Sequence, residues 1–98
     1  MTPDNVFSGA LLEEQALDIQ ELASACAVAP EWVVERVQAG LLTYDSWSGG
    51  EMRFASAHLI RARRMATTER SFDANQELAA LVADLIEEVE QLRRQLQR

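Results

Sequence analysis

The sequence predicts a mainly α-helical protein, in which a winged helix-turn-helix head with a small β-hairpin wing precedes a long C-terminal coiled-coil helix. Two short amphipathic patterns lie a few residues apart, a glycine-containing turn separates two short apolar runs, and the last quarter carries a heptad repeat of aliphatic residues. A chain of 98 residues suits one small domain with an appendage. We therefore expect a head at residues 1–70 and a coiled-coil dimerisation helix at residues 71–98.

The first two helices are predicted from the residues at their ends. Asp18, followed by Glu21 three residues later, has the pattern of a capping box at a helix N-terminus. Pro30 suits the first turn of a second helix, where an amide donor is not needed. Gly40 suits the position after the end of that helix, because glycine readily takes a positive φ. The two helices and the short turn between them form a helix-turn-helix.

A β-hairpin wing is predicted after the second helix. Residues 41–44 and 51–54 fit two short strands, and the sequence Ser46-Trp-Ser-Gly-Gly50 between them is rich in turn residues. Trp47 would then lie at the tip of the wing. Before the first helix, residues 9–16 fit either a short edge strand or the approach to that helix.

The C-terminal part is predicted to form two further helices. A third helix is expected at residues 56–70, and Asp73 with Gln76 three residues later begins the last one. The last helix has an aliphatic seam whose residues are alternately four and three positions apart. Leu81 and Ile86 widen this seam near the start of the helix, where the seam can also pack on the head. Beyond that point only the seam stays apolar, so we expect a second copy of the chain to cover it. The seam is Leu78, Val82, Leu85, Val89, Leu92 and Leu96, of which Leu85, Val89, Leu92 and Leu96 are the predicted dimerisation residues.

Charge is distributed unevenly along the chain, whose net charge is −7. Residues 1–55 carry nine acidic residues and two arginines, whereas residues 56–98 carry seven of each. An acidic head repels phosphate backbones and anionic membranes, so we expect neither as a partner and expect a basic protein surface instead. The N-terminus lacks a signal-peptide pattern and no apolar run reaches membrane-spanning length, which makes the cytoplasm the expected location.

Five residues of the head are candidates for binding a partner: Glu31, Glu35, Asp45, Trp47 and Glu51. Glu31 and Glu35 lie one turn apart on the second helix and fit either a solvated face or a contact for lysine and arginine. Asp45 and Glu51 extend the same acidic surface from the wing. Trp47 either anchors a partner or packs back onto the head.

The other side chains that could take part in chemistry or binding are expected to have structural roles. Cys26 suits a small core position, His58 falls in the first turn of the third helix, and Trp32 is expected between the head and a neighbouring helix. The sequence has no second cysteine, phosphate loop or catalytic triad, so we expect no enzymatic activity, metal or cofactor. The basic cluster of the third helix fits pairing with the acidic head or weak DNA contact. It consists of Arg61, Arg63, Arg64 and Arg70.

The order of these elements resembles the MerR-like winged-helix family over residues 17–65. The residues that carry the resemblance are Ile19-Gln-Glu-Leu22, Pro30 ten residues before Gly40-Leu-Leu42, Phe54 after the wing, and Leu59. The resemblance implies a DNA-binding transcription regulator, which is the alternative function. Where that family usually carries an arginine and a tyrosine on the second helix, this chain has Val34 and Glu35, and Met52 replaces the arginine before the wing aromatic. The positions that read DNA in such regulators are therefore apolar or acidic here.

The whole chain also resembles the CbpM family of chaperone modulators. The shared features are the length, the MerR-like head, the acidic second helix, the short third helix and the leucine-rich last helix. This resemblance implies a non-enzymatic modulator that binds the J-domain of a DnaJ-like co-chaperone, CbpA, and inhibits its action with DnaK. J-domains present a basic helix to DnaK, and an acidic head would complement such a surface.

Overall fold

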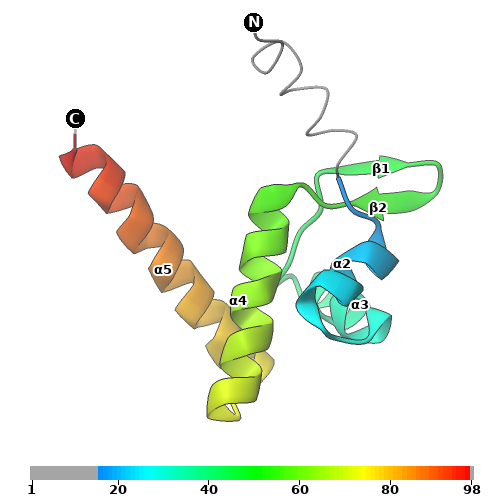
Figure 1. Ribbon diagram of the computed structural model, residues 1–98, viewed down its shortest axis with the longest axis horizontal. Helices are drawn as coiled ribbons and strands as arrows, with labels where there is room; N and C mark the ends of the chain where they lie inside the picture. Colours follow the sequence, from blue (N-terminus) through cyan, green and yellow to red (C-terminus); the bar gives the residue numbers. More distant parts are fainter. Residues whose placement is uncertain (1–15, 98) are drawn as a thin grey trace, which may run out of the picture.

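The computed structural model describes residues 16–97, except for the side chains of residues 46–48. The described part confirms a mainly helical winged helix-turn-helix, with a two-stranded hairpin between its helices (Figure 1). The prediction for residues 9–16 falls, apart from Ala16, outside the described residues. The elements are α2 (Ile19–Cys26), α3 (Pro30–Gln38), β1 (Ser46–Ser48), β2 (Glu51–Arg53), α4 (Ser56–Phe72) and α5 (Gln76–Leu96).

The ends of α2 and α3 form as their sequences predict. The Glu21 amide donates to the Asp18 carboxylate over 2.8 Å, and the Asp18 amide donates to the Glu21 carboxylate over 3.0 Å, which completes the capping box. A left-handed Ala27, with φ of 59°, ends α2. Pro30 occupies the first turn of α3, and Gly40 beyond its end has φ of +77°. The helix-turn-helix prediction is confirmed.

The wing is shorter than predicted and begins later. Its strands pair antiparallel, with Ser46 opposite Arg53 and Trp47 opposite Met52. The turn is Gly49-Gly50, and both residues have a positive φ, as a tight type I′ hairpin requires. Trp47 therefore lies in the middle of β1 rather than at the wing tip, and its side chain is outside what the structure describes.

The prediction of a first strand at residues 41–44 is wrong. The amides of Leu41 and Leu42 donate to the Arg36 carbonyl, over 2.9 and 3.2 Å, and so complete the C-terminus of α3. The Leu42 side chain is fully buried in the core. This segment is apolar because it fills the core between α3 and the wing, and it belongs to neither of the two strands.

The core of the head lies between α2, α3, α4 and the wing. Its largest buried side chains are Leu22, Val33, Leu42 and Phe54, and small residues of α4 complete it. Leu17 and Phe54 exchange two backbone hydrogen bonds of 2.8 Å, which fastens the approach to α2 against the end of the wing. Cys26 is a buried core residue, as predicted, and burial raises the pKa of its thiol despite the opposing charges of Arg63 and Arg70.

The start of α5 differs from the prediction by two residues. Asp73 takes a left-handed conformation, with φ of 51°, and ends α4 instead of capping α5. Asn75 is the N-cap, and its side-chain oxygen accepts a 2.8 Å hydrogen bond from the Leu78 amide. An aspartate and an asparagine suit both positions, so the sequence pattern alone did not separate them.

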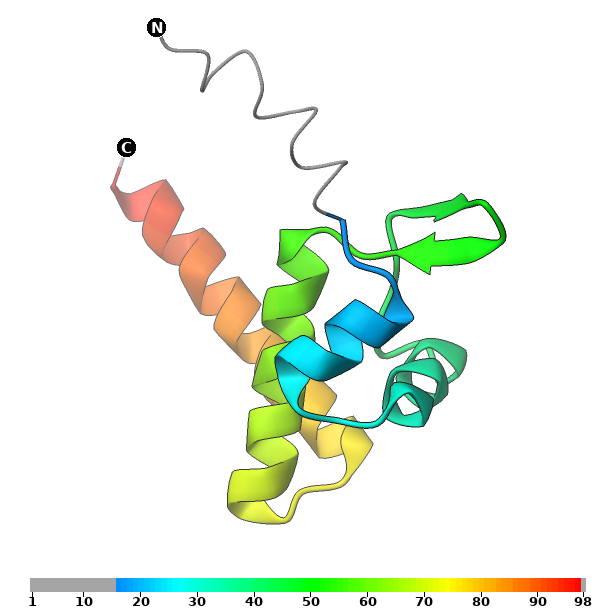
Figure 2. The same cartoon turned by 45° about the vertical axis from the view of Figure 1, so that its right-hand side comes forward.

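The small side chains of α5 make its contact with α4. Ala79, Ala80 and Ala83 pack against the fully buried Met65. Of the two residues that widen the seam, Leu81 is 52% exposed, whereas Ile86 is partly buried and lines a pocket together with residues of α4. Alanines allow two helices to approach closely and leave the larger residues of α5 on another face. Residues 91–97 are all exposed, and Figures 1 and 2 show this end of α5 projecting away from the head.

Candidate partner-binding surface

A groove of about 350 Å³ opens between the first turns of α2 and α3 and the wing. Val34 of α3 and Met52 of β2 both line it, although they come from different elements. These are two of the positions at which the resemblance to DNA-reading winged helices calls for other residues. The helix-turn-helix places α3 beside the wing, so the fold itself brings them together. The lining residues are Ile19, Gln20, Pro30, Val34, Gly50, Glu51 and Met52.

One acidic side chain lines this groove and a second is close to it in sequence. Glu51 lines it from the wing, and Glu31 follows the lining residue Pro30 in the first turn of α3. Both are exposed. Neither side chain makes a hydrogen bond or an ion pair with any other described residue. Glu35, one turn further along α3, is 66% exposed and forms an exposed ion pair of 3.0 Å with Arg36. Three of the five predicted binding residues thus lie on α3 and β2, the two elements that line the groove together with α2, and one of them, Glu51, is in the lining itself.

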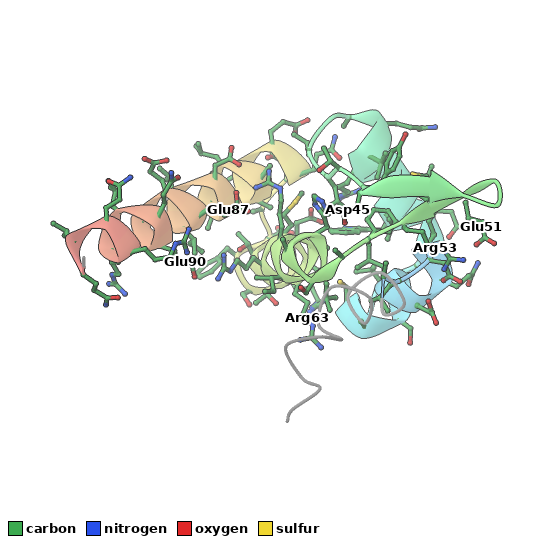
Figure 3. The ribbon with its side chains drawn as sticks, turned by 90° about the horizontal axis from the view of Figure 1, so that it is seen from above. Asp45, Glu51, Arg53, Arg63, Glu87 and Glu90 are labelled. Carbon is green, nitrogen blue, oxygen red and sulfur yellow. The ribbon has the colours of Figure 1, made fainter. Side chains whose placement is uncertain are left out.

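Asp45 has an intramolecular role. Its carboxylate accepts a 2.5 Å hydrogen bond from the Ala55 amide at the start of α4 and lies 3.1 Å from Nε2 of His58. Thr43 lies 3.3 Å from the other ring nitrogen of His58, which sits in the first turn of α4 as predicted. Figure 3 shows Asp45 at the base of the wing and Glu51 towards its tip. Asp45 therefore fixes the wing to α4, and the structure does not bring it to the groove.

Helix α3 is held to α4 by a cluster of polar side chains around Glu69. The indole Nε1 of Trp32 donates to Glu69 over 2.9 Å, and the guanidinium of Arg36 donates to both Glu69 oxygens over 2.8 and 3.3 Å. The same guanidinium lies 4.6 Å from the centre of a Trp32 ring, a cation–π contact. Trp32 packs against both apolar clusters of the molecule, which confirms its predicted place between the head and a neighbouring helix.

The Glu69 cluster determines which charges α3 exposes to solvent. Arg36 is the only cation of that helix, and its side chain is just 12% exposed because it faces α4. The exposed face of α3 therefore presents Glu31 and Glu35. No sequence pattern singles out Glu69, which is one acid among several on the C-terminal helices.

Two arginines of α4 pair with α5, not with the acidic head as predicted. Arg61 forms ion pairs with Asp84 over 2.8 Å and Glu87 over 3.0 Å, and Arg64 pairs with Glu90 over 2.6 Å. Burial opposes the charge of Arg61, but its hydrogen bonds with Glu87 and Asp84 raise its pKa. The hydrogen bond from Arg64 lowers the pKa of Glu90. These ion pairs join the two helices beside their alanine contact.

The other two arginines of α4 donate to the end of α2. Arg63 donates to the Ala25 carbonyl over 3.4 Å, and Arg70 donates to the Cys26 carbonyl over 3.2 Å. Carbonyls in the last turn of a helix lack partners within that helix and carry its negative dipole, which favours cations there. These two arginines therefore contact the head through backbone oxygens, whereas the prediction was pairing with its acidic residues.

The aliphatic seam of α5 lies in solvent. Four of its residues are roughly half exposed and the last is 85% exposed, whereas Val82 is only partly exposed. Among the described residues nothing covers this face, and exposed leucines in continuous heptad spacing are typical of a helix that pairs with another. Dimerisation remains a prediction. The exposed seam residues are Leu78, Leu85, Val89, Leu92 and Leu96.

Within residues 16–97, no group of three or more histidine, cysteine, aspartate or glutamate side chains is placed to hold a metal ion. No helix in the same part of the chain is long and apolar enough to cross a membrane.

Comparison with known proteins places the chain in a group of regulators. A family model described as MerR HTH family regulatory protein matches residues 17–98, which covers the head and α5 together. No curated protein and no solved structure matches the chain.

Proposed function

The chain belongs to the MerR HTH family of regulatory proteins, and we propose that it regulates by binding a basic protein surface instead of DNA. In the form that its resemblance to the CbpM family implies, it is a cytoplasmic chaperone modulator. Its acidic head would bind the J-domain of a DnaJ-like co-chaperone, CbpA, and inhibit the action of that co-chaperone with DnaK.

The face of α3 beside the wing is the observation that supports this proposal. A winged helix that binds DNA needs cations and hydrogen-bond donors on that face, because phosphates supply most of the affinity and base edges the specificity. Here α3 contributes Val34 and the acid Glu31, and the neighbouring β2 contributes Met52 and the acid Glu51. Arg36, the one cation of α3, is turned towards Glu69. Such a surface repels a phosphate backbone and attracts lysines and arginines.

The opposite charge of the partner would act mainly on the rate of association and on specificity. Among the described residues 16–55 there are six acids and two arginines, an excess of four negative charges on the part of the head that contains the groove. Binding should therefore weaken as salt screens these charges.

Calorimetry with the isolated J-domain of a CbpA-like protein from the same organism tests the partner. We expect binding at micromolar concentrations in low salt, and absence of binding under these conditions would contradict the proposal. The double variant Glu31→Lys and Glu35→Lys should weaken binding about tenfold or more, in line with charge reversal at an interface. Glu88→Lys, which reverses an exposed charge on α5, is the matched control and should bind as the native chain does.

We propose a homodimer through α5 as the second part of this function. The exposed seam from Leu85 to Leu96 supports it, because a half-exposed row of leucines on a projecting helix is covered most simply by a second copy. Sedimentation of the native chain at tens of micromolar should give a dimer, and the double variant Leu85→Glu and Leu92→Glu should give a monomer. A native monomer under these conditions would contradict the pairing.

Transcription regulation through DNA is the second candidate, and the family match together with the helix-turn-helix and wing favours it. A pool of genomic DNA fragments distinguishes it from the first. Retarded migration with the native chain at low salt would support DNA binding, whereas unchanged migration beside measurable J-domain binding would support the protein-binding proposal.

A further inference from the structure

The groove between α2, α3 and the wing has an apolar floor. Ile19, Val34 and Met52 line it from three different elements, and all three side chains are only partly buried. Ile19 and Met52 also pack against the core cluster, which fixes them in place. Partly exposed aliphatic side chains that converge from separate elements offer a pre-formed site for an apolar group.

Size and lining narrow down what the groove can accept. Its volume of about 350 Å³ is at the lower end of the range for ligand pockets, which suits a side chain or two better than a large cofactor. No lysine, arginine or histidine lines it, so it has nothing to neutralise a phosphate or a carboxylate. An apolar side chain fits the floor.

The walls of the groove give the charge of the occupant. Glu51 lines the groove from the wing, and Glu31 follows the lining residue Pro30 in the first turn of α3; both are exposed carboxylates without an ion-pair partner among the described residues. On α2, the nearby acids Asp18 and Glu21 are occupied by the capping box. One carboxylate in the lining and a second one residue from it favour cations beside an apolar side chain.

We propose that this groove is an anchor site for one aliphatic side chain of a basic partner segment, whose flanking lysines or arginines contact Glu31 and Glu51. The inference rests on the proposed function for the identity of the partner, while the chemistry of the groove comes from its own residues. The anchor supplies affinity in a desolvated pocket, and the flanking ion pairs supply selection against acidic segments.

Two probes test the groove on the full chain. The first is the isolated J-domain of the CbpA-like protein. The second is a capped peptide with a central leucine between lysines, compared with peptides in which serine replaces the leucine or glutamates replace the lysines. The readouts are calorimetry and the NMR shifts of the backbone amides of Ile19, Val34 and Met52. We expect both probes to shift these amides, and neither comparison peptide to do so.

Variants of the floor complete the test. Val34→Ser should weaken binding of the J-domain about tenfold or more, as truncation at an interface hot spot does, and Met52→Ser should do the same from the wing. Ile60→Ser is the matched control, because Ile60 is a 47% exposed aliphatic residue on α4, away from the groove. Thermal unfolding of each variant shows whether it keeps the native fold.

The outcomes separate the groove from the partner. J-domain binding that leaves the groove amides unshifted, or that Val34→Ser and Ile60→Ser affect equally, overturns the groove inference while the proposed function stands. Groove shifts with the leucine–lysine peptide but no J-domain binding support the groove and overturn the proposed partner. Absence of J-domain binding in calorimetry, together with no shift from the leucine–lysine peptide, overturns both.

Discussion

Acidic side chains have opposite uses on α5, where it faces α4, and on the surface of the head beside the groove. On α5, Asp84, Glu87 and Glu90 all form ion pairs with arginines of α4. On the head, Glu31 and Glu51 are exposed beside a groove and pair with no other described residue. The same residue type therefore stabilises the helix pair in one region and remains available to a partner in the other.

The large apolar residues show the reverse contrast. In the head they are buried, with Leu22, Leu42 and Phe54 at the centre of the core. On α5 the buried residues are alanines, and the leucines of the seam lie in solvent. The head thus buries its large apolar residues and exposes charged ones. By contrast, α5 exposes an apolar face of the kind that typically contacts a partner.

The largest stability effect is expected within the head, where α3 meets α4. Replacing Glu69 by alanine removes the acceptor of Trp32 and leaves Arg36, in a partly buried site, with only its exposed pair to Glu35. We expect the free energy of unfolding to fall by about 2–3 kcal/mol, because breaking one side of a buried charge pair leaves the other uncompensated. Chemical denaturation at a fixed protein concentration measures this, since dimerisation would make stability concentration-dependent.

Glu35→Ala is the matched control for Glu69. Both carboxylates contact Arg36, but the Glu35 side chain is 66% exposed and that of Glu69 is 16% exposed. An exposed pair contributes at most about 0.5–1 kcal/mol. Equal losses from the two variants would contradict the view that the Glu69 cluster fastens α3 to α4.

Removal of Arg61 should have the next largest effect. Its guanidinium, 16% exposed, contacts Asp84, Glu87 and the Leu41 carbonyl, and so joins α4, α5 and the segment after α3. We expect Arg61→Ala to lower the free energy of unfolding by about 1–2 kcal/mol, more than an ordinary surface ion pair because of its hydrogen bond to the backbone. Arg63→Ala, which removes an exposed arginine with one long hydrogen bond, should cost less than about 0.5 kcal/mol. A larger loss of stability from Arg63→Ala than from Arg61→Ala would contradict the view that Arg61 joins these three segments.

The acids beside the groove should contribute almost nothing to stability. Glu31→Gln and Glu51→Gln together remove two charges from a chain of net charge −7 and break no described ion pair. We expect the free energy of unfolding to change by no more than about 0.5 kcal/mol, or to rise slightly as self-repulsion falls. A clear loss of stability in denaturant would show that these carboxylates have a structural role, and would remove the contrast with α5.

The parts of the fold that follow from local chemistry were predictable from the sequence. The capping box of Asp18 and Glu21, Pro30 in the first turn of α3, and the seam of α5 each depend on residues a few positions apart. The first strand was misplaced because Leu41 and Leu42 are apolar for another reason, namely burial against helices distant in sequence. Period and propensity do not distinguish a short core segment from a short strand.

The candidate site was predictable in composition but not in arrangement. Glu31 and Glu51 were found from charge alone, while the groove beside them depends on how α2, α3 and the wing pack. Asp45 looked equivalent to these acids, yet its carboxylate is used at the start of α4. The role of Glu69 could not be predicted for the same reason, since its partners lie more than 30 residues earlier in the chain.

The smallest effect, and the most specific, concerns the pH dependence of Glu90. The Arg64 hydrogen bond holds the pKa of Glu90 below its ordinary value of 4.5 in the folded chain. A carboxylate with a lowered folded pKa stabilises fully above its unfolded pKa, and this stabilisation is lost as the pH falls through the folded pKa. Native chain should therefore unfold at a higher temperature than Glu90→Gln at pH 7, and the difference should shrink below about pH 4.5 and vanish in stronger acid. Glu88 has no described partner, so Glu88→Gln should show no such convergence. A difference in unfolding temperature between the native chain and Glu90→Gln that stays constant with pH would show that the Arg64–Glu90 pair does not help to join α4 to α5.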